Sequence, residues 1–517
     1  MEGLLMLFIV FTGVNNIFFD YQPLEVILKS IAIDHYEALY RTTITLALLV
    51  LVTYNFIKAS AYLNSLAIQP ATTFALSFIF LIMLGTMMLM MPEMTAQQGS
   101  AATFFESFFT SVSVSCVTGI TIVDTGTFWS FKGQIVILIL IQFGGIGLVS
   151  FATFFATFMK NGMGVKQQVI MQDFLNSESL NSAQSLLRQI ISVTIFFELF
   201  AIVSIYFTWG NDVQFATEVE KIYYSVFHGI SAFCSAGVTL FPEGLYSPEL
   251  RNSLLLHMVI TCTVIFGGIG FSVIQDVLSP SRLRERLQKP WKDWKLSSKI
   301  AVYSTIVLIM AGMLVIAPLE WNNDKTLGNM GVFERIIASF FQSVATRTSG
   351  FNTIDIGSLT TPVLLFIIFL MFIGASSGST GGGIKTSTFT VIAWSALSTV
   401  RGRKEMHMGG RTITNELIFK AYSIFVFAAT YNLVAIFILT ISDPDIPVFD
   451  LVFQQIAAFS TAGLTTGIVD GLSITGKTVL MVSMYIGRIG TLTLALALST
   501  KAPTNSYTYP KAHLFIG

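Results

Sequence analysis

Long apolar runs separated by short polar segments dominate the hydrophobic pattern of this chain. Runs of this length can cross the ~30 Å hydrocarbon core of a bilayer as helices. The candidate spans are residues 3–19, 41–58, 70–92, 130–159, 188–209, 252–278, 299–318, 360–400 (interrupted), 416–441 and 475–500. The pattern therefore predicts an all-α polytopic membrane protein.

Four shorter apolar segments lie between the spans, at 104–116, 222–234, 333–346 and 449–459. They are too short to cross a bilayer, which favours re-entrant or interfacial helices. Each is followed at once by a turn of glycine with small and hydroxylated residues. The turns are "CVTGITIVD" from Cys116, "CSAGVTLF" from Cys234, "RTSGFNTID" from Arg347 and "STAGLTTGIVD" from Ser460.

The four turns belong to an internal repeat. Aligned on Gly119, Gly237, Gly350 and Gly463, they follow one another at intervals of 118, 113 and 113 residues. A phenylalanine stands ten positions before each glycine, and a second glycine cluster follows 24 to 30 residues after it. The clusters are "FGGIG" from Phe143, "FGGIG" from Phe266, "IGASSG" from Ile373 and "IGRIG" from Ile486.

The repeat divides the chain into five parts. Residues 1–65 would form two extra N-terminal transmembrane helices, and the repeats would occupy 66–160, 161–280, 281–400 and 401–517, the last with a cytoplasmic tail. Glycine clusters can serve close helix packing, and this reading stays open for the second clusters. Irregular backbone at membrane depth must be buried in protein or line a water-filled path. The turns therefore point to a shared axis.

Composition and charge support a membrane protein that handles cations. The chain is 53% hydrophobic and 11% charged, with a mean hydropathy of +0.72, outside the range of soluble domains. With the N-terminus inside, 18 of the 29 Lys and Arg flank cytoplasmic ends, while 20 of the 29 Asp and Glu lie outside. The outer acids would concentrate cations. A net charge of zero gives no reason to expect a nucleic-acid partner.

No catalytic or metal-binding motif accompanies these features. The sequence has no P-loop, no HExxH and no defensible Ser/His/Asp arrangement, so we expect no enzyme activity. The three cysteines lack metal-ligand spacing and are predicted to serve packing. Glu2 stands where a signal peptide would carry a basic residue, which predicts a retained N-terminal helix.

The turns suit the binding of a dehydrated monovalent cation. Backbone carbonyls can replace the water that such an ion loses, and glycine aims carbonyls without a side chain in the path. None of the residue pairs that directly precede the four glycines is charged, which favours K⁺ over divalent ions. The predicted K⁺ selectivity filter comprises Val117, Thr118, Gly119, Ser235, Ala236, Gly237, Thr348, Ser349, Gly350, Thr461, Ala462 and Gly463, with K⁺ at the four glycines.

These motifs resemble the Ktr/Trk/HKT superfamily of potassium transporters. "VATRTSGFNT", "FSTAGLTTG", "FGGIG" and "SSGSTGGGIKTSTF" match its pattern, and the resemblance covers roughly residues 65 to 517. It implies four M1–pore helix–M2 repeats around one central pore, and Gly119 in place of serine favours K⁺ over Na⁺. The tail "YPKAHLFIG" resembles that of the Ktr membrane subunit, whereas the two leading spans are more Trk-like.

The same resemblance implies a setting and partners. It places the chain as a multi-pass protein in lipid, in the bacterial cytoplasmic (inner) membrane, and as a homodimer. It also implies cytoplasmic nucleotide-binding RCK-type regulatory subunits, which would dock on basic segments such as "SRLRERLQKPWKDWK". K⁺, with Na⁺ as the alternative ion, would be the cargo, and no covalently bound cofactor is expected.

Two features inside the membrane predict a gate. Arg488 takes a position that is Gly145, Gly268 or Ala375 in the other repeats. It is either a structural arginine or a positive barrier beneath the filter, and the resemblance favours the barrier. "GASSGSTGGGIKTSTF" interrupts the third repeat, as a packing kink or as an intramembrane gating loop. The predicted gate residues are Gly378, Gly381, Gly382, Gly383, Lys385 and Arg488, although Lys385 could instead be a snorkelling lysine.

Three further polar residues lie within apolar surroundings. Glu198 stands in the span 188–209 as a coupling group or a buried structural carboxyl. Arg347 is expected to brace the filter through carbonyls or an acid such as Glu106 or Glu334, and His228 to support the filter. The main hypothesis is K⁺ uptake through a gated filter. The alternatives are a Na⁺- or H⁺-coupled K⁺ symporter and a non-conducting membrane scaffold.

Overall fold

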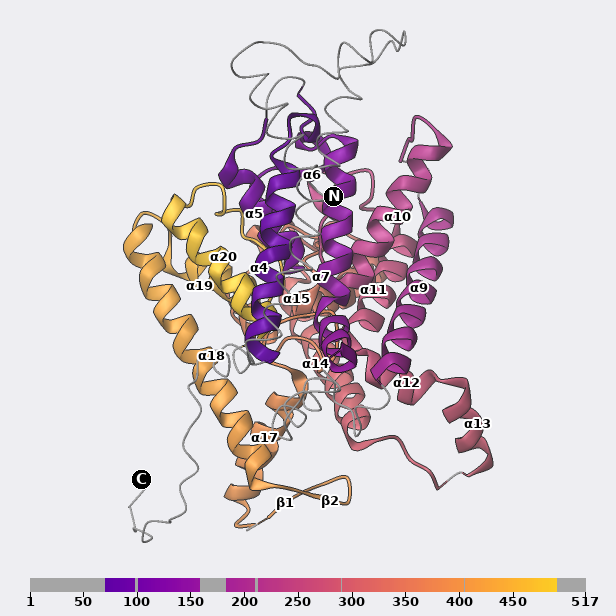
Figure 1. Ribbon diagram of the computed structural model, residues 1–517. Helices are drawn as coiled ribbons and strands as arrows, with labels where there is room; N and C mark the ends of the chain where they lie inside the picture. The colour runs from indigo at the N-terminus through magenta and orange to yellow at the C-terminus, as the bar shows by residue number, and fades with distance from the viewer. Residues whose placement is uncertain are drawn as a thin grey trace, which may run out of the picture. The chain divides into compact units, whose positions relative to one another are not determined.

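The computed structural model describes residues 70–97, 101–158, 183–209, 213–289, 291–403 and 405–490. The two expected N-terminal spans, the middle of the 160–187 connection and the tail from residue 491 lie outside the described residues. Within the described part the chain is almost entirely helical, with one two-stranded sheet (Figure 1).

Four short helices each end at one of the glycine turns. They are α5 (Phe104–Ser115), α10 (Glu218–Cys234), α15 (Val332–Thr348) and α19 (Val448–Phe459). The expected boundaries are thus confirmed to within a few residues. Local sequence explains the start of α5, because the Thr103 hydroxyl accepts from the Glu106 N–H and the Glu106 carboxylate accepts from the Thr103 N–H, a capping box.

Longer apolar helices surround these four. They are α4 (Pro70–Leu89), α7 (Phe131–Phe158), α9 (Ala183–Thr208), α11 (Leu254–Ile269), α14 (Leu296–Glu320), α16 (Thr361–Phe372), α17 (Thr386–Val400), α18 (Asn415–Ser442) and α20 (Ile474–Ile489). Short elements connect them: η1 (Pro92–Met94), α6 (Thr125–Phe128), η3 (Gly244–Tyr246), α12 (Phe271–Leu278), α13 (Pro280–Gln288) and η4 (Ile356–Ser358). The interruption predicted in 360–400 is confirmed between α16 and α17.

Among the described residues, three helical segments are long and apolar enough to span a membrane unaided: Gln189–Thr208, Leu296–Glu320 and Asn415–Ser442. A fourth span is available if the pair α11 and α12 is counted as one. That pair corrects the sequence expectation, which treated 252–278 as a straight span. The chain bends by 101° between the two helices. Gly270 makes the break with φ +103°, a conformation that side chains rarely adopt.

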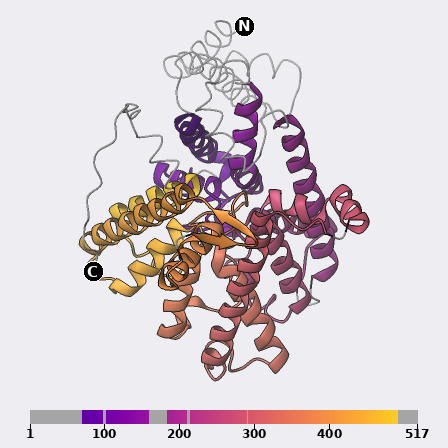
Figure 2. The ribbon, with the colours of Figure 1, turned by 90° about the horizontal axis from the view of Figure 1, so that it is seen from below.

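Each short helix packs on helices near it in sequence. α5 lies against α4 and α7, α10 against α9 and α11, α15 against α14 and α16, and α19 against α18 and α20. Seen from below, the groups follow one another around a centre, from indigo through magenta and salmon to yellow (Figure 2). Sequence-distant segments therefore meet at that centre.

The same cross-helix contact occurs in the first and third groups. The Ser111 hydroxyl donates to the Ile82 carbonyl at 2.6 Å, and the Ser343 hydroxyl donates to the Ile309 carbonyl at 2.7 Å. In each case a glycine three residues after the carbonyl gives the serine room to approach. Small residues at such crossings let helix backbones come close.

A β-hairpin lies in the connection 401–415, for which the sequence analysis predicted no secondary structure. Strand β1 (Met406–Met408) pairs antiparallel with β2 (Arg411–Ile413). The two-residue turn Gly409–Gly410 has φ +56° and +75°, as a type I′ turn requires. The adjacent glycines were the available sequence signal for this hairpin.

Candidate functional site

Three of the four turns share one backbone design at the end of the short helix. The amides of Thr118, Ala236 and Ala462 each donate to the carbonyl five residues earlier, at 2.8–2.9 Å. This is the six-to-one bond of a Schellman motif, which needs a left-handed residue at the position before. Those residues are not glycine: Val117, Ser235 and Thr461 have φ +56°, +59° and +51°.

A left-handed conformation is costly for a branched side chain, at roughly 1–2 kcal/mol. The strain is held by burial, since Val117, Ser235 and Thr461 have no solvent-exposed surface. Residues whose strained backbone is held in place by the surrounding structure cluster at functional sites. The strain therefore marks the turns as more than ordinary helix ends.

The third turn is built differently. α15 continues to Thr348, and the Ser349 amide donates to the carbonyl of Ala345, four residues earlier, at 3.0 Å. Its helix register is also displaced, because Phe341 is buried while the aligned Phe340 is only partly buried. The sequence alignment of the third helix on Phe340 is thus off by one residue in the structure.

The four glycines are brought together in a closed cycle. A Cβ placed on Gly119 would overlap the carbonyl oxygen of Ala236, the residue before the next glycine. In the same way Gly237 faces the carbonyl of Ser349, Gly350 that of Ala462, and Gly463 that of Thr118. Each of the four positions also has φ between +67° and +86°. At Gly119, Gly237 and Gly463 the approach leaves no room for a side chain, while at Gly350 a Cβ would lie 3.2 Å from the Ala462 carbonyl oxygen and fit only tightly.

The oxygens at this cycle come from backbone and hydroxyl groups. The filter residues predicted from sequence carry no carboxylate. Among the described residues, no group of three or more His, Cys, Asp or Glu side chains is placed to hold a metal ion. Neutral dipoles of this kind can coordinate a monovalent cation that has lost part of its water.

The loop between α16 and α17 lies against three of the four turns. The Thr380 hydroxyl is 3.3 Å from the Ser235 hydroxyl, and the Gly382 amide donates to the Thr461 hydroxyl at 3.0 Å. Gly381 lies close to the methyl group of Thr348: a Cβ added to Gly381 would lie 2.4 Å from that methyl carbon. These contacts are all made at the residue two before the glycine. The loop thus occupies the space on one side of the cycle.

Arg488 joins this loop to a distant helix. Its guanidinium donates to the carbonyl of Thr380 on the loop and to the carbonyls of Gly144 and Gly145 in α7. The side chain is buried, and its partners are neutral carbonyls. Arg488 therefore cross-links the third and first groups while its charge stays uncompensated by those partners.

The other two basic residues near the loop also bind carbonyls. The Lys385 ammonium donates to the Gly381 carbonyl at 2.5 Å, within the loop itself. Arg347 makes a long bond of 3.5 Å to the Gly374 carbonyl, where the loop begins. The acid partners considered for Arg347 are corrected: Glu106 and Glu334 accept instead from the backbone at the starts of their own helices.

In three of the four groups, the second glycine cluster packs against the end of the short helix. The first glycine of the cluster lies against the carbonyl of the residue four before the turn glycine: Gly144 on Ser115, Gly267 on Phe233 and Gly487 on Phe459. A side chain at any of these positions would displace the end of the short helix. Close packing, the open alternative for these clusters, therefore accounts for these glycines.

Several residues that support the turns were not predicted from the sequence. Ser231 donates to the Val238 carbonyl at 2.8 Å and so ties α10 to the residue after Gly237. His228 does not do this: its Nδ1 lies 2.8 Å from the Tyr224 carbonyl, among aromatic rings. Thr380 was missed as a contact of Ser235. The spacing of the serines along α10 was the only feature of the local sequence that could have indicated this role of Ser231.

Glu198 lies behind the second turn. Its Oε2 accepts from the Gln142 amide at 3.0 Å, and its Oε1 lies 3.9 Å from the Cys234 sulfur, which can donate to it. Cys234 precedes Ser235, the strained residue of this turn. The described contacts of Glu198 thus connect α9 with α7 and α10 and do not reach the glycine cycle.

The chain is similar to known proteins in both sequence and fold. The family model TrkH, described as a cation transport protein, matches residues 47–509. The chain belongs to this family. As a member it is a membrane transport protein and not an enzyme.

The relatives and the solved fold agree with that assignment. The chain is 35% identical to Ktr system potassium uptake protein B of Bacillus subtilis, over 87% of this chain and 97% of the relative. It is 30% identical to the potassium/sodium uptake protein NtpJ of Enterococcus hirae, over 87% and 98%. The crystal structure of the potassium transporter TrkH from Vibrio parahaemolyticus aligns over 96% of this chain and 97% of that one, with a TM-score of 0.66 at 16% identity. That likeness shows the fold.

Proposed function

We propose that this chain takes up K⁺ through a pore whose selectivity filter is the cycle of glycine turns. The cyclic contact of Gly119, Gly237, Gly350 and Gly463 carries the proposal, because four carbonyl-bearing turns around one point suit a single ion path. Relatives named potassium uptake proteins support K⁺ as the cargo. Four M1–pore helix–M2 repeats would then surround that path.

The gate would be the loop from Gly374 to Lys385 together with Arg488. The loop contacts three turns, and an uncompensated guanidinium stands beside it. A positive charge beneath a cation filter raises the barrier to flow. Opening would require the loop to leave the turns and Arg488 to release the Thr380 carbonyl.

The wider assembly is proposed from the family alone. A homodimer in the bacterial cytoplasmic membrane would be regulated by cytoplasmic nucleotide-binding RCK-type subunits. The membrane potential would drive uptake, at ~2.3 kcal/mol per charge for each 100 mV.

A second candidate is uptake of both K⁺ and Na⁺, or K⁺ uptake coupled to Na⁺ or H⁺. One relative is named for potassium and sodium. Glu198 is the buried carboxyl that coupling would use, and its contacts behind the second turn favour a structural role instead. Glu198→Gln separates the two: coupling predicts loss of ion dependence with K⁺ binding intact.

Growth of a potassium-uptake-deficient bacterium at low K⁺ tests the main proposal. The wild type, with an RCK-type subunit supplied, is expected to restore growth and K⁺ uptake. Gly119→Ser should lose K⁺ preference, because its side chain would need φ +86° and would overlap the Ala236 carbonyl. Gly402→Ser is the matched control, since Gly402 has φ +67° with nothing within 4 Å.

Each outcome tests a different part of the proposed function. Restored uptake with unchanged preference in Gly119→Ser keeps the transport role and rejects the filter. No uptake by the wild type in any arrangement favours the non-conducting scaffold. Unchanged K⁺ preference in Gly402→Ser excludes a serine at positive φ, by itself, as the cause of lost preference in Gly119→Ser.

A further inference from the structure

An apolar edge is exposed on and just after α13. Leu283, Leu287 and Trp291 are 43%, 84% and 79% exposed. The two leucines are four residues apart and share a helix face, and the tryptophan follows four residues later. Exposed large apolar groups in a cluster mark an interaction surface.

Basic residues surround this edge. The segment 282–299 holds seven Lys and Arg against Glu285 and Asp293. Arg284, Lys289 and Lys292 are exposed. Leucine and tryptophan on one side with cationic residues beside them are typical of a helix that lies in a membrane interface. The complementary surface is a leaflet that carries anionic lipid.

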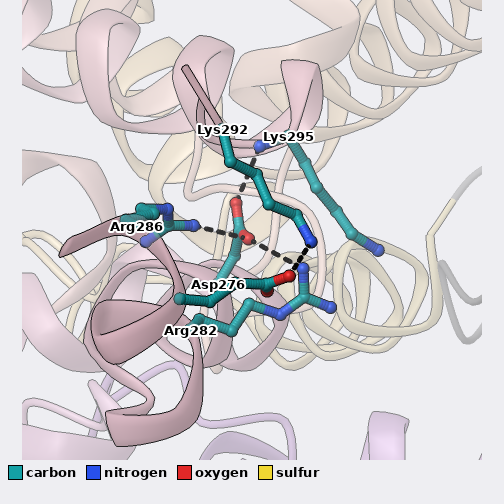
Figure 3. A network of polar contacts seen from close by, with 6 residues as sticks. Asp276, Arg282, Arg286, Lys292 and Lys295 are labelled. Atoms are coloured by element: carbon teal, nitrogen blue, oxygen red, sulfur yellow. Dashed lines mark hydrogen bonds and ion pairs between the residues drawn. The ribbon is translucent and has the colours of Figure 1, made fainter. Parts of the chain in front are cut away.

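Asp276 at the end of α12 fixes the position of α13 (Figure 3). Its carboxylate is 3% exposed and accepts from Arg286 at 2.9 Å and from the Lys295 backbone amide at 2.8 Å. Arg282 lies 3.5 Å from the same oxygen as Arg286. The arginines turn toward Asp276, and the leucines, one position further along the helix and about 100° around its axis, remain exposed.

The location of α13 also favours lipid. It follows directly on the broken span α11–α12, and both ribbon views place it at the margin of the described helices (Figures 1 and 2). We propose that Leu283, Leu287 and Trp291 insert into the cytoplasmic leaflet, with the flanking basic residues on anionic headgroups. This surface, rather than a regulatory subunit, would then engage most of the basic segment.

The surface is connected to the proposed gate through α12. The Phe271 amide at the start of α12 donates to the Gly378 carbonyl of the loop at 3.0 Å, and the Ser376 amide donates to the Gly268 carbonyl at 3.1 Å. Lipid bound to α13 would therefore also restrain α12, because Asp276 links the two helices and α12 contacts the loop. Anionic lipid should bias the loop position, a consequence that rests on the proposed transport function.

Fluorescence of the full chain in vesicles tests the surface. The chain is reconstituted in phosphatidylcholine with increasing brominated phosphatidylglycerol, and the Trp291 signal is the difference between wild type and Trp291→Phe. We expect quenching that rises with the brominated lipid. Arg284→Gln with Lys289→Gln should raise the lipid fraction for half-quenching by about fivefold for each charge removed. Arg403→Gln with Arg411→Gln is the control, because both residues are exposed and lie outside the segment.

K⁺ flux in the same vesicles tests the link to the loop. Wild-type flux should depend on the phosphatidylglycerol fraction, and Asp276→Asn should abolish that dependence while Trp291 stays quenched. Flux that is independent of lipid in the wild type rejects the link. Absent flux with intact quenching refutes the transport proposal and leaves the surface supported.

Three results would refute the proposed lipid-binding surface. One is absence of Trp291 quenching by any brominated lipid. Another is equal quenching by brominated phosphatidylglycerol in the wild type and the charge-depleted variant. Shielding of Trp291 only after a cytoplasmic protein is added would assign the edge to a protein partner and equally reject the lipid surface.

Discussion

A methyl group on Gly463 provides the sharpest test of the glycine cycle. At φ +75° it would overlap the Thr118 carbonyl oxygen and lie 2.9 Å from the Cα of Gly350. Both neighbours are backbone atoms, so the Thr118 carbonyl must move by about 1 Å to restore van der Waals contact. Gly463→Ala therefore disturbs two turns at once.

Gly467→Ala supplies the comparison. Gly467 follows in the same loop with φ +92°, and nothing lies within 4 Å of its added Cβ. Both variants meet the ~1–2 kcal/mol cost of a left-handed alanine, while only Gly463→Ala displaces a carbonyl. Loss of one carbonyl contact to a cation is worth about 1.5–3 kcal/mol, or about 10- to 100-fold in K⁺ affinity.

The assay is K⁺ uptake into vesicles as a function of K⁺ concentration, with thermal unfolding of each purified variant. We expect a lower unfolding temperature for Gly463→Ala than for Gly467→Ala, because only the former displaces backbone atoms, together with a weakened apparent K⁺ affinity for Gly463→Ala and wild-type affinity for Gly467→Ala. Equal K⁺ affinity in both variants, with Gly463→Ala folded, would refute the reasoning that the cycle binds the ion.

Three further substitutions test the surroundings of the site. Arg488→Gln removes the charged donor to three carbonyls and should raise basal K⁺ flux severalfold, whereas Lys477→Gln, at a half-buried position in the first turn of α20, should not; equal flux in both would contradict the barrier. Thr380→Val removes the hydroxyl next to Ser235, worth ~1 kcal/mol, and should raise flux about fivefold at most; reduced flux would argue against a closing contact. Glu320→Gln breaks a fully buried carboxylate that accepts from Thr360 and should lower the free energy of unfolding by about 1–3 kcal/mol in a chemical-unfolding measurement, while the exposed Glu249→Gln should leave it unchanged.

Hydrophobic length and periodicity were sufficient to locate most helices. Apolar runs long enough to span gave α9, α14 and α18, and the short runs before the turns gave α5, α10, α15 and α19. These features are local, because a helix satisfies its own backbone and needs only an apolar stretch of suitable length. The bend at Gly270 was not predicted, since the same "FGGIG" sequence remains helical in α7.

The glycine turns were also visible from sequence, but their meeting was an inference from repetition. By itself the sequence determined an apolar, helical, four-fold repeated chain with uncharged glycine turns. Only the tertiary structure decided that each turn glycine faces the carbonyl of the next, that the loop at Thr380 lies against three turns, and that Arg488 reaches α7. Most of those contacts join residues more than a hundred positions apart, and no local pattern encodes which backbone atoms such distant segments place side by side.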